Sequence, residues 1–394
     1  MFAATAPFRK AAARAMALLA MVWLAACDAT LPAGLGTGPL GNDGPGIRPG
    51  ETVQVALLVP QSDPQAGPVA QSLENAARMA LAETGADIEL VVYDTAGQPA
   101  QAAARAREAV DAGAKIVLGP LRSETSNAVA RAVPEVNVLS FSNTTSIAGG
   151  NLFVLGRTFD NIAQRLVDYG VSNGVRNIAV LHTADVPGQV GRNAIQTAAV
   201  RGGAQVVASE GYELNTQSLI AALDRIAPVV QNGNADGLFL TDGWEAGLAQ
   251  VFQMAPENGI SPDAVQYMGL TRWDVRPDGF NLPGIKGGLF TMPSRSQQTA
   301  FENRYRERYG SAPGPLAGLG YDGISAVATL LQDQRRTSLS GSALTRSAGF
   351  NGTGGRFRLM ADGTNQRALA VATIRNRQVT ILDPAPTGFG GAGF

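Results

Sequence analysis

Apolar and polar residues form blocks of two kinds along the chain from Val53 onward. Short apolar runs, such as 53–60 (with Gln54 as its one polar residue) and 116–118, have the length of strands that are buried on both faces. The longer segments between them, such as 66–83 and 99–112, place apolar residues three or four positions apart, which is the spacing of one helix face. Strands that alternate with helices of this length predict parallel sheets covered by helices on both sides.

The alternation continues after a predicted crossover at 153–158, so we predict an α/β fold of two lobes with several crossovers acting as a hinge. The first lobe is expected to include the strand near 288–292, and the second lobe to be completed by strands at 356–359, 369–375 and 379–382, the last two forming a hairpin. The predicted lobe boundaries are 51–156 plus 275–350 for lobe 1, and 157–274 plus 351–385 for lobe 2.

The N-terminal segment has the layout of an export signal. Arg9, Lys10 and Arg14 precede an apolar run at 15–26, which is too short to span a bilayer as a helix. The run ends Leu-Ala-Ala before Cys27, a pattern that resembles the bacterial lipobox, in which the cysteine receives lipid. We therefore predict a lipoprotein signal peptide at 1–26 and lipidation of Cys27, with a plain secretory signal as the alternative.

The segments flanking the lobes are rich in glycine. Residues 27–50 contain seven glycines and four prolines without apolar periodicity, which predicts a flexible tether. The tail 386–394 is also glycine-rich and is expected to be loose.

Composition excludes several functions. The full chain has a formal net charge of −1, and removal of the signal peptide with its three basic residues leaves 28 basic against 32 acidic residues. This balance does not favour nucleic acid or an anionic membrane surface as a partner. One cysteine and one histidine exclude a disulfide framework and a cluster of Cys and His metal ligands, and we expect no cofactor.

Two polar loops follow neighbouring predicted strands in the stretch 116–146. Ser123 stands where a helix N-cap is expected, and Ser142 and Thr144 belong to the hydroxyl-rich run that follows the next strand. The carboxyl ends of parallel strands meet at one edge of a sheet, where such folds bind ligands. Hydroxyls and free N–H groups there suit a carboxylate, and ordinary capping and turn formation is the alternative interpretation.

This stretch is similar to the ligand-clasping region of leucine-binding-type, type I periplasmic binding proteins. The resemblance extends from Val53 through YDTAG (93–97) to YDGI (321–324), and it is nearest to lipoproteins named penicillin-binding-protein activators. It implies that Ser123, Ser142 and Thr144 hold the carboxylate and ammonium of an amino acid. The implied fold is the two-lobed type I periplasmic-binding-protein fold.

The second lobe offers Glu245, which matches the acidic residue that meets the ligand's ammonium group in this family. A glutamate near a helix start also complements the helix dipole, so the position has an ordinary structural interpretation. Trp244 either stacks on a ligand or covers the lobe surface.

The chain departs from the family where aromatic side chains usually cover the ligand. Residues 61–66 and 184–187 contain none, which puts a branched aliphatic ligand in doubt. The lone histidine, His182, could pair with Asp185, but a structural role is the simpler interpretation because no nucleophile motif accompanies it. We expect a binding protein and no enzyme.

Two functions follow from the resemblance. The first is a periplasmic receptor, lipid-anchored to the inner or outer membrane of a Gram-negative bacterium, that binds an amino acid or similar small zwitterion for import through an ABC permease. The second is an activator of peptidoglycan synthesis that contacts a penicillin-binding protein. The loops at Ser123, Ser142, Thr144 and Glu245 favour the receptor, whereas the missing aromatic residues favour the activator.

Overall fold

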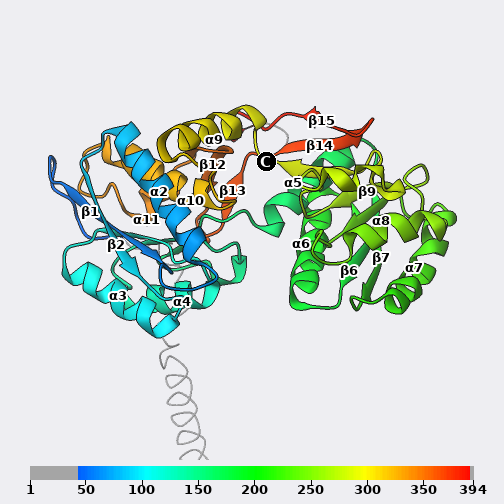
Figure 1. The fold of residues 1–394 in the computed structure, drawn as a ribbon, viewed down its shortest axis with the longest axis horizontal. Coiled ribbons are helices and arrows are strands. Elements are labelled where there is room, and N and C mark those ends of the chain that lie inside the picture. Colours follow the sequence, from blue (N-terminus) through cyan, green and yellow to red (C-terminus); the bar gives the residue numbers. More distant parts are fainter. Residues whose placement is uncertain (1–42, 391–394) are drawn as a thin grey trace, which may run out of the picture. The chain divides into compact units, whose positions relative to one another are not determined.

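The computed structural model describes residues 43–390, and its first lobe is built on a five-stranded parallel sheet (Figure 1). Alternate residues of the first strand enter two different cores: Val55, Leu57 and Val59 pack on one face, and Ala56 and Leu58 on the other. This is why nearly every residue of the strand is apolar. In sheet order the strands are β2 (Ile88–Asp94), β1 (Val53–Val59), β3 (Ile116–Leu118), β4 (Val138–Ser140) and β5 (Leu152–Val154).

Helices cover both faces of this sheet. The core on one face includes apolar side chains of α2 and α10, and the core on the other face includes those of α3 and α4. The helices of this lobe are α2 (Gly67–Thr84), α3 (Pro99–Asp111), α4 (Ser123–Ala132), α9 (Arg295–Tyr309), α10 (Ala317–Leu331) and α11 (Gly341–Leu344), with a 3-10 turn η2 (Thr145–Ile147).

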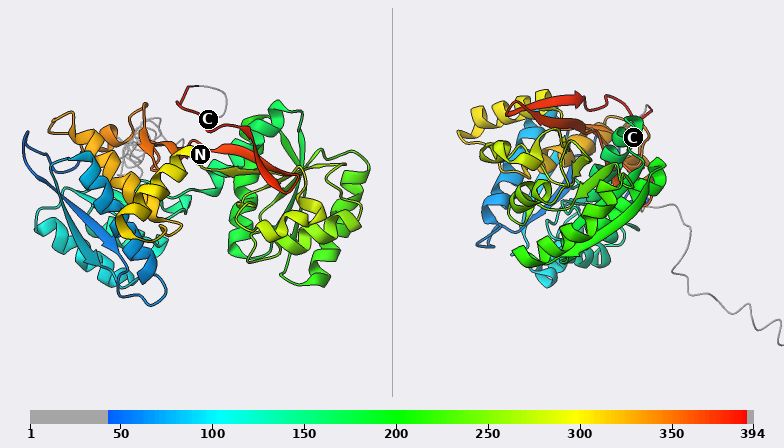
Figure 2. Two further views of the ribbon diagram at one scale, coloured as in Figure 1. Left: turned by 45° about the horizontal axis from the view of Figure 1, so that its top comes forward. Right: turned by 90° about the vertical axis from the view of Figure 1, so that its right-hand side faces the viewer.

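The second lobe is built on a seven-stranded mixed sheet (Figure 2). Five strands are parallel, and the hairpin β14–β15 adds two antiparallel strands at one edge. In sheet order the strands are β15 (Gln378–Asp383), β14 (Ala370–Arg375), β10 (Leu289–Met292), β9 (Gln266–Gly269), β8 (Gly237–Leu240), β6 (Asn177–Thr183) and β7 (Gln205–Tyr212).

The helices of the second lobe include one that the sequence analysis did not anticipate. This helix, α5, follows the first crossover and begins behind Thr158, whose hydroxyl accepts the N–H of Asn161 at 3.2 Å. The helices are α5 (Phe159–Ser172), α6 (Val186–Gly202), α7 (Thr216–Gln231) and α8 (Leu248–Glu257), with 3-10 turns η3 (Pro277–Asn281) and η4 (Pro283–Ile285).

The α/β fold with two helix-covered sheets is confirmed, but two predicted assignments of strands are wrong. β10 (Leu289–Met292) belongs to the second sheet and not to the first lobe, because it pairs with β9 and β14 and buries Phe290. The predicted strand 356–359 belongs with the first lobe: Phe357 and Leu359 enter that lobe's core. They lie in a separate three-stranded sheet of β11 (Phe350–Gly352), β12 (Gly355–Leu359) and β13 (Asn365–Arg367).

The predicted tether extends too far into the folded chain. Ile47 is only 5% exposed and packs in the first core, and its N–H donates to the carbonyl of Arg336 at 3.1 Å. A buried apolar side chain with a paired backbone is the reason that this part is ordered structure. The signal peptide, Cys27 and the tether up to residue 42 lie outside the described residues.

Hydrogen bonds tie the crossovers between the two sheets to one another. The amide nitrogen of Asn365 donates to the carbonyls of Val154 at 2.7 Å and Gly156 at 2.8 Å. Arg367 donates to the carbonyl of Leu155 and forms an ion pair with Asp322 at 2.9 Å. The crossover from β5 is thereby fixed against the crossover that leads into β14.

Candidate functional site

Each sheet reverses its strand order beside one strand, which is where α/β sheets place ligands. In the first sheet this strand is β1, which pairs with β2 on one side and β3 on the other. In the second sheet it is β6, between β7 and β8. Ser123 follows β3, Ser142 and Thr144 follow the adjoining β4, and Glu245 follows β8. We call these loops the strand-end region.

Ser123 is not the N-cap of α4 but its first residue, so the predicted capping role is wrong. The N-cap position is taken by Arg122 in an extended conformation. Its guanidinium pairs with Asp63 at 2.8 Å, and Asp63 also accepts the N–H groups of Ala66 and Gln65. These backbone bonds, foremost that of Ala66, lower the pKa of Asp63. The loop beside Ser123 therefore already contains an ion pair.

Ser142 and Thr144 are brought together by a hydrogen bond. The buried Ser142 hydroxyl accepts the N–H of Thr144 at 3.1 Å, and the N–H of Ser142 donates to the hydroxyl of Ser140 at 3.0 Å. The hydroxyl of Ser140 lies 2.7 Å from that of Ser126 on α4. The hydroxyls of Ser140 and Ser142 thus shape their own loop, whereas no hydrogen bond of the half-buried Thr144 hydroxyl is found within residues 43–390.

Glu245 is exposed in the turn after β8 and lies outside the first turn of a helix, because α8 begins only at Leu248. Trp244 beside it packs edge-on against Phe252, with ring centroids 5.9 Å apart. Its indole N–H donates to the carbonyl of Arg272 at 3.1 Å. Trp244 therefore serves the packing of the second lobe.

A buried acid that the sequence analysis did not single out ends β8. Asp242 is 2% exposed, and one of its oxygens accepts a hydrogen bond from the hydroxyl of Tyr212. The other oxygen has no partner within the described chain. Burial raises the pKa of Asp242 to about 6.

His182 and Asp185 are not joined by a hydrogen bond in the structure. A ring nitrogen of His182 lies 2.8 Å from the carbonyl oxygen of Thr183. Asp185 accepts the hydroxyl of Thr183 and the N–H of Gly188, which makes it the N-cap of α6. Next to it, Val186 is 73% exposed.

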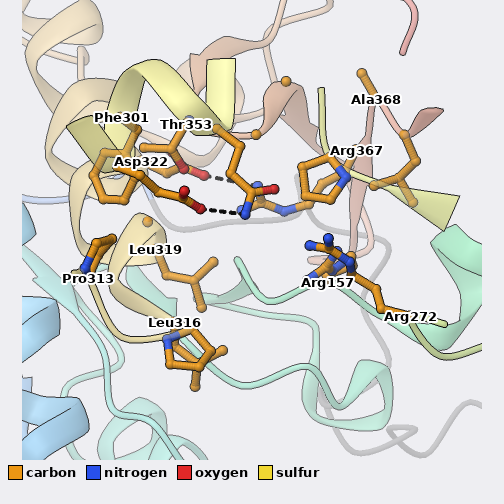
Figure 3. Close-up of a pocket in the computed structure, with 18 of the residues that line it drawn as sticks. Arg157, Arg272, Phe301, Pro313, Leu316, Leu319, Asp322, Thr353, Arg367 and Ala368 are labelled. Atoms are coloured by element: carbon orange, nitrogen blue, oxygen red, sulfur yellow. Dashed lines mark hydrogen bonds and ion pairs between the residues drawn. The ribbon is translucent and has the colours of Figure 1, made fainter. Parts of the chain in front are cut away.

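A pocket with a volume of about 530 Å³ lies beside the crossovers (Figure 3). It is lined by residues of the crossovers, of α9, of the loop 313–319 and α10, and of the loop after β9. None of the four sequence-predicted ligand residues lines it. We call it the arginine pocket, because its charged lining is Arg157, Arg272, Arg356, Arg367, Glu302 and Asp322.

The arginines of this pocket differ in their partners. Arg272 forms a two-bond ion pair with Asp274, and Arg367 pairs with Asp322. The guanidinium of Arg157 forms no hydrogen bond or ion pair with any other residue of 43–390. Burial and the nearby charges of Arg272 and Arg367 lower the pKa of Arg157 from 12.5 to about 10. The charge of Asp274 acts in the opposite direction, but its carboxylate is paired with Arg272, so Arg157 has no counter-ion of its own among residues 43–390.

The sequence profile of a family described as periplasmic binding protein matches residues 52–378. The chain belongs to the periplasmic binding protein family. A search of curated proteins found no match. The resemblance that extends from Val53 through the YDTAG and YDGI segments is therefore confirmed at the level of the family.

Solved structures show the same fold at low identity. A Rhodospirillum rubrum protein assigned as a branched-chain amino acid ABC transporter gives a TM-score of 0.72 at 18% identity, with 84% of this chain and all of that chain covered. A Desulfitobacterium hafniense ABC transporter substrate-binding protein in complex with leucine gives 0.61 at 21%, covering 84% and 100%. An R. palustris solute-binding protein in complex with benzoate gives 0.56 at 16%, covering 87% and 99%.

In this periplasmic binding protein, the structure brings only two of the predicted ligand residues together. Ser142 and Thr144 share a bond, but no hydrogen bond or ion pair in 43–390 joins them to Ser123 or Glu245. The arginine pocket escaped the sequence analysis because its residues come from segments up to 200 positions apart. The only local signal was Arg157, an arginine within the predicted crossover 153–158.

Two further surveys cover residues 43–390. In this part of the chain no helix is long and apolar enough to cross a membrane. The same residues contain no group of three acidic, histidine or cysteine side chains that could hold a metal ion.

Proposed function

We propose that the protein is a receptor that binds a small carboxylate-bearing solute, without catalysis, and delivers it to an ABC importer. The observation that carries the proposal is the arginine pocket. Its volume of about 530 Å³ lies in the range of small-molecule sites, and it combines apolar walls with an arginine that has no counter-ion. Membership of the periplasmic binding protein family supports the same role.

Related structures support a carboxylate as the common feature of the ligand. Leucine and benzoate, the ligands in the complexes of two structural neighbours, share a carboxylate and an apolar body. An amino acid or similar zwitterion is the ligand predicted from Ser123, Ser142, Thr144 and Glu245. These residues remain our proposed contacts in the strand-end region.

We further propose that the protein is anchored in the periplasm by lipid on Cys27. Buried acyl chains would hold it at the inner or outer membrane through the hydrophobic effect. Intact-mass analysis of membrane-extracted protein should show acylation at Cys27, and Cys27→Ala should leave an uncleaved or mislocalised precursor. A free thiol on Cys27 of the mature protein would contradict the anchor.

The alternative, an activator that contacts a penicillin-binding protein, expects a cleft filled by apolar side chains such as Val186 and Pro187. Val186 is 73% exposed, which favours the receptor instead. A solute receptor also needs to change shape when ligand binds.

Two measurements separate these functions. Calorimetry on residues 43–394 with a panel of amino acids and simple organic acids should detect binding, and small-angle scattering should show compaction with the ligand that binds. Absence of both, with recovery of a penicillin-binding protein in a pull-down from solubilised envelopes, would establish the activator.

A further inference from the structure

Arg157 projects from a backbone that the fold holds on both sides. Asn365 binds the carbonyl of Gly156 at 2.8 Å, and Arg367 binds that of Leu155. On the other side, Thr158 caps α5. The position of the Arg157 backbone is therefore set by tertiary hydrogen bonds, while its guanidinium remains without a partner among the described residues.

The charges around Arg157 do not neutralise it. Asp274 is engaged by Arg272, and Asp322 accepts both Arg367 at 2.9 Å and the N–H of Thr353 at 2.7 Å. Both carboxylates therefore already have cationic partners. The pocket therefore has one positive charge in excess, which suits a ligand with a single anionic group.

Glu302 and Arg356 are the other charged residues of the pocket. Glu302 forms no ion pair within 43–390 and accepts the side-chain amide of Gln298 at 2.7 Å. Arg356 donates to the carbonyl oxygens of Ala348 and Thr387. Arg356 is itself a cation without a carboxylate partner, and Glu302 forms no ion pair with Arg157 within 43–390. The four arginines of the lining stand against three carboxylates, those of Asp274, Asp322 and Glu302.

The opposite side of the pocket is apolar. Figure 3 shows Leu316 and Leu319 on the side of the pocket opposite Arg157 and Arg272. Two apolar side chains of the lining are unusually exposed, Val275 at 56% and Leu316 at 38%. A ligand with an apolar body would remove this surface from water, which is favourable by about 25 cal/mol per Å².

We propose that the arginine pocket binds a small monocarboxylic acid, with the carboxylate on Arg157 and the apolar body against Val275, Leu316 and Leu319. The proposal rests on the proposed receptor function and assigns its ligand class and its anchoring residue. A guanidinium offers two parallel N–H donors to a carboxylate, and the partial desolvation of Arg157 strengthens such a pair. The strand-end region, none of whose predicted ligand residues lines this pocket, is a separate candidate site.

The test is calorimetry with matched pairs of acid and amide: benzoate with benzamide, and leucine with leucinamide. The wild-type protein should bind at least one acid and not the corresponding amide. Arg157→Gln should weaken binding of that acid by roughly 10- to 150-fold, because hydrogen bonds to charged groups contribute about 1.5–3 kcal/mol. Arg157→Lys should lose less affinity for that acid, since it keeps the charge but not the two parallel donors.

Arg306→Gln is the matched control, because Arg306 is exposed on the pocket helix α9 and does not line the pocket. It should bind as the wild type does. The unfolding midpoint of Arg157→Gln without ligand should not fall, which separates loss of a ligand contact from loss of the fold. Unchanged acid binding in Arg157→Gln would overturn this inference alone, whereas no binding of any acid by the wild type would overturn the receptor function as well.

Discussion

The strand-end region and the arginine pocket are both polar, yet the fold uses their polar groups in opposite ways. In the strand-end region, Ser142 is bonded to Thr144 and Asp63 is paired with Arg122. In the arginine pocket, the crossovers hold Arg157 in place and leave its guanidinium without a partner.

This difference shows that a polar motif at a strand end is not by itself a free binding surface. Short hydroxyl side chains readily bond to nearby backbone, so a loop rich in serine and threonine can satisfy itself. A guanidinium can donate to carbonyl oxygens, as that of Arg356 does, but its buried positive charge is neutralised only by a group of opposite charge. The second situation is the stronger indication of a ligand.

The largest expected effect concerns the ion pair that supports the pocket. Asp322→Ala should lower the free energy of unfolding by about 3–5 kcal/mol, because it leaves Arg367 partly buried without its carboxylate. Urea denaturation followed by far-ultraviolet circular dichroism measures this. The control Asp278→Ala breaks the exposed, solvent-screened pair with Arg276 and should have a much smaller effect. Equal effects of the two variants would contradict the structural role of Asp322.

The second effect is a pH dependence in the strand-end region. Asp242 has its pKa raised from 3.8 to about 6 in the fold, so its contribution to stability is complete below about pH 4 and is lost as the pH rises through 6. By this shift, the free energy of unfolding of Asp242→Asn should rise by about 3 kcal/mol relative to that of the wild type between pH 4 and 7.5.

Denaturation of the wild type and of Asp242→Asn at several pH values measures that gain as a difference between the two proteins. The difference is needed because other groups, such as Asp63 with its lowered pKa, contribute the opposite slope. Glu245→Gln, which removes an exposed carboxylate of the same turn, is the control variant. A constant difference for Asp242→Asn would show that the pKa of this acid is the same in the folded and unfolded states.

The third effect tests the strand-end region as a ligand site. If an amino acid is held there, Thr144→Ala should weaken its binding by roughly 10- to 150-fold. Glu245→Gln should weaken amino acids more than their deaminated analogues, because the ammonium group loses its carboxylate. Calorimetry with both variants measures this, and wild-type affinity in both would exclude the strand-end site while leaving the arginine pocket untouched.

The smallest expected effect concerns the stability of the ligand-free protein. Arg157→Gln should raise the free energy of unfolding of the ligand-free protein by about 1–2 kcal/mol, since it removes a partly desolvated charge without a counter-ion. The matched change Arg122→Gln removes an arginine that is paired with Asp63 and should not stabilise. Destabilisation by Arg157→Gln would mean that the fold itself supplies a counter-ion.

Most of the regular structure was predictable because it depends on local pattern. The ranges of α2 and α3 agree with the predicted 66–83 and 99–112 to within about a residue, and the final hairpin turns at Asn376 and Arg377, between its two predicted strands. β10 was assigned to the wrong sheet, because four apolar residues indicate a buried strand without indicating which sheet it joins.

The sequence by itself determined that this chain forms two helix-covered sheets of the periplasmic-binding-protein type. The alternation of apolar runs and helical periodicity depends only on residues that are close together in the sequence. Only the tertiary structure decided which polar groups are free. The hydroxyl of Ser142 and the carboxylate of Asp63 find partners in their own chain. Arg157 does not, because Asp274 and Asp322, which come from other segments, are already bound to Arg272 and Arg367. Such pairing depends on distances between residues far apart in sequence, which no local pattern records.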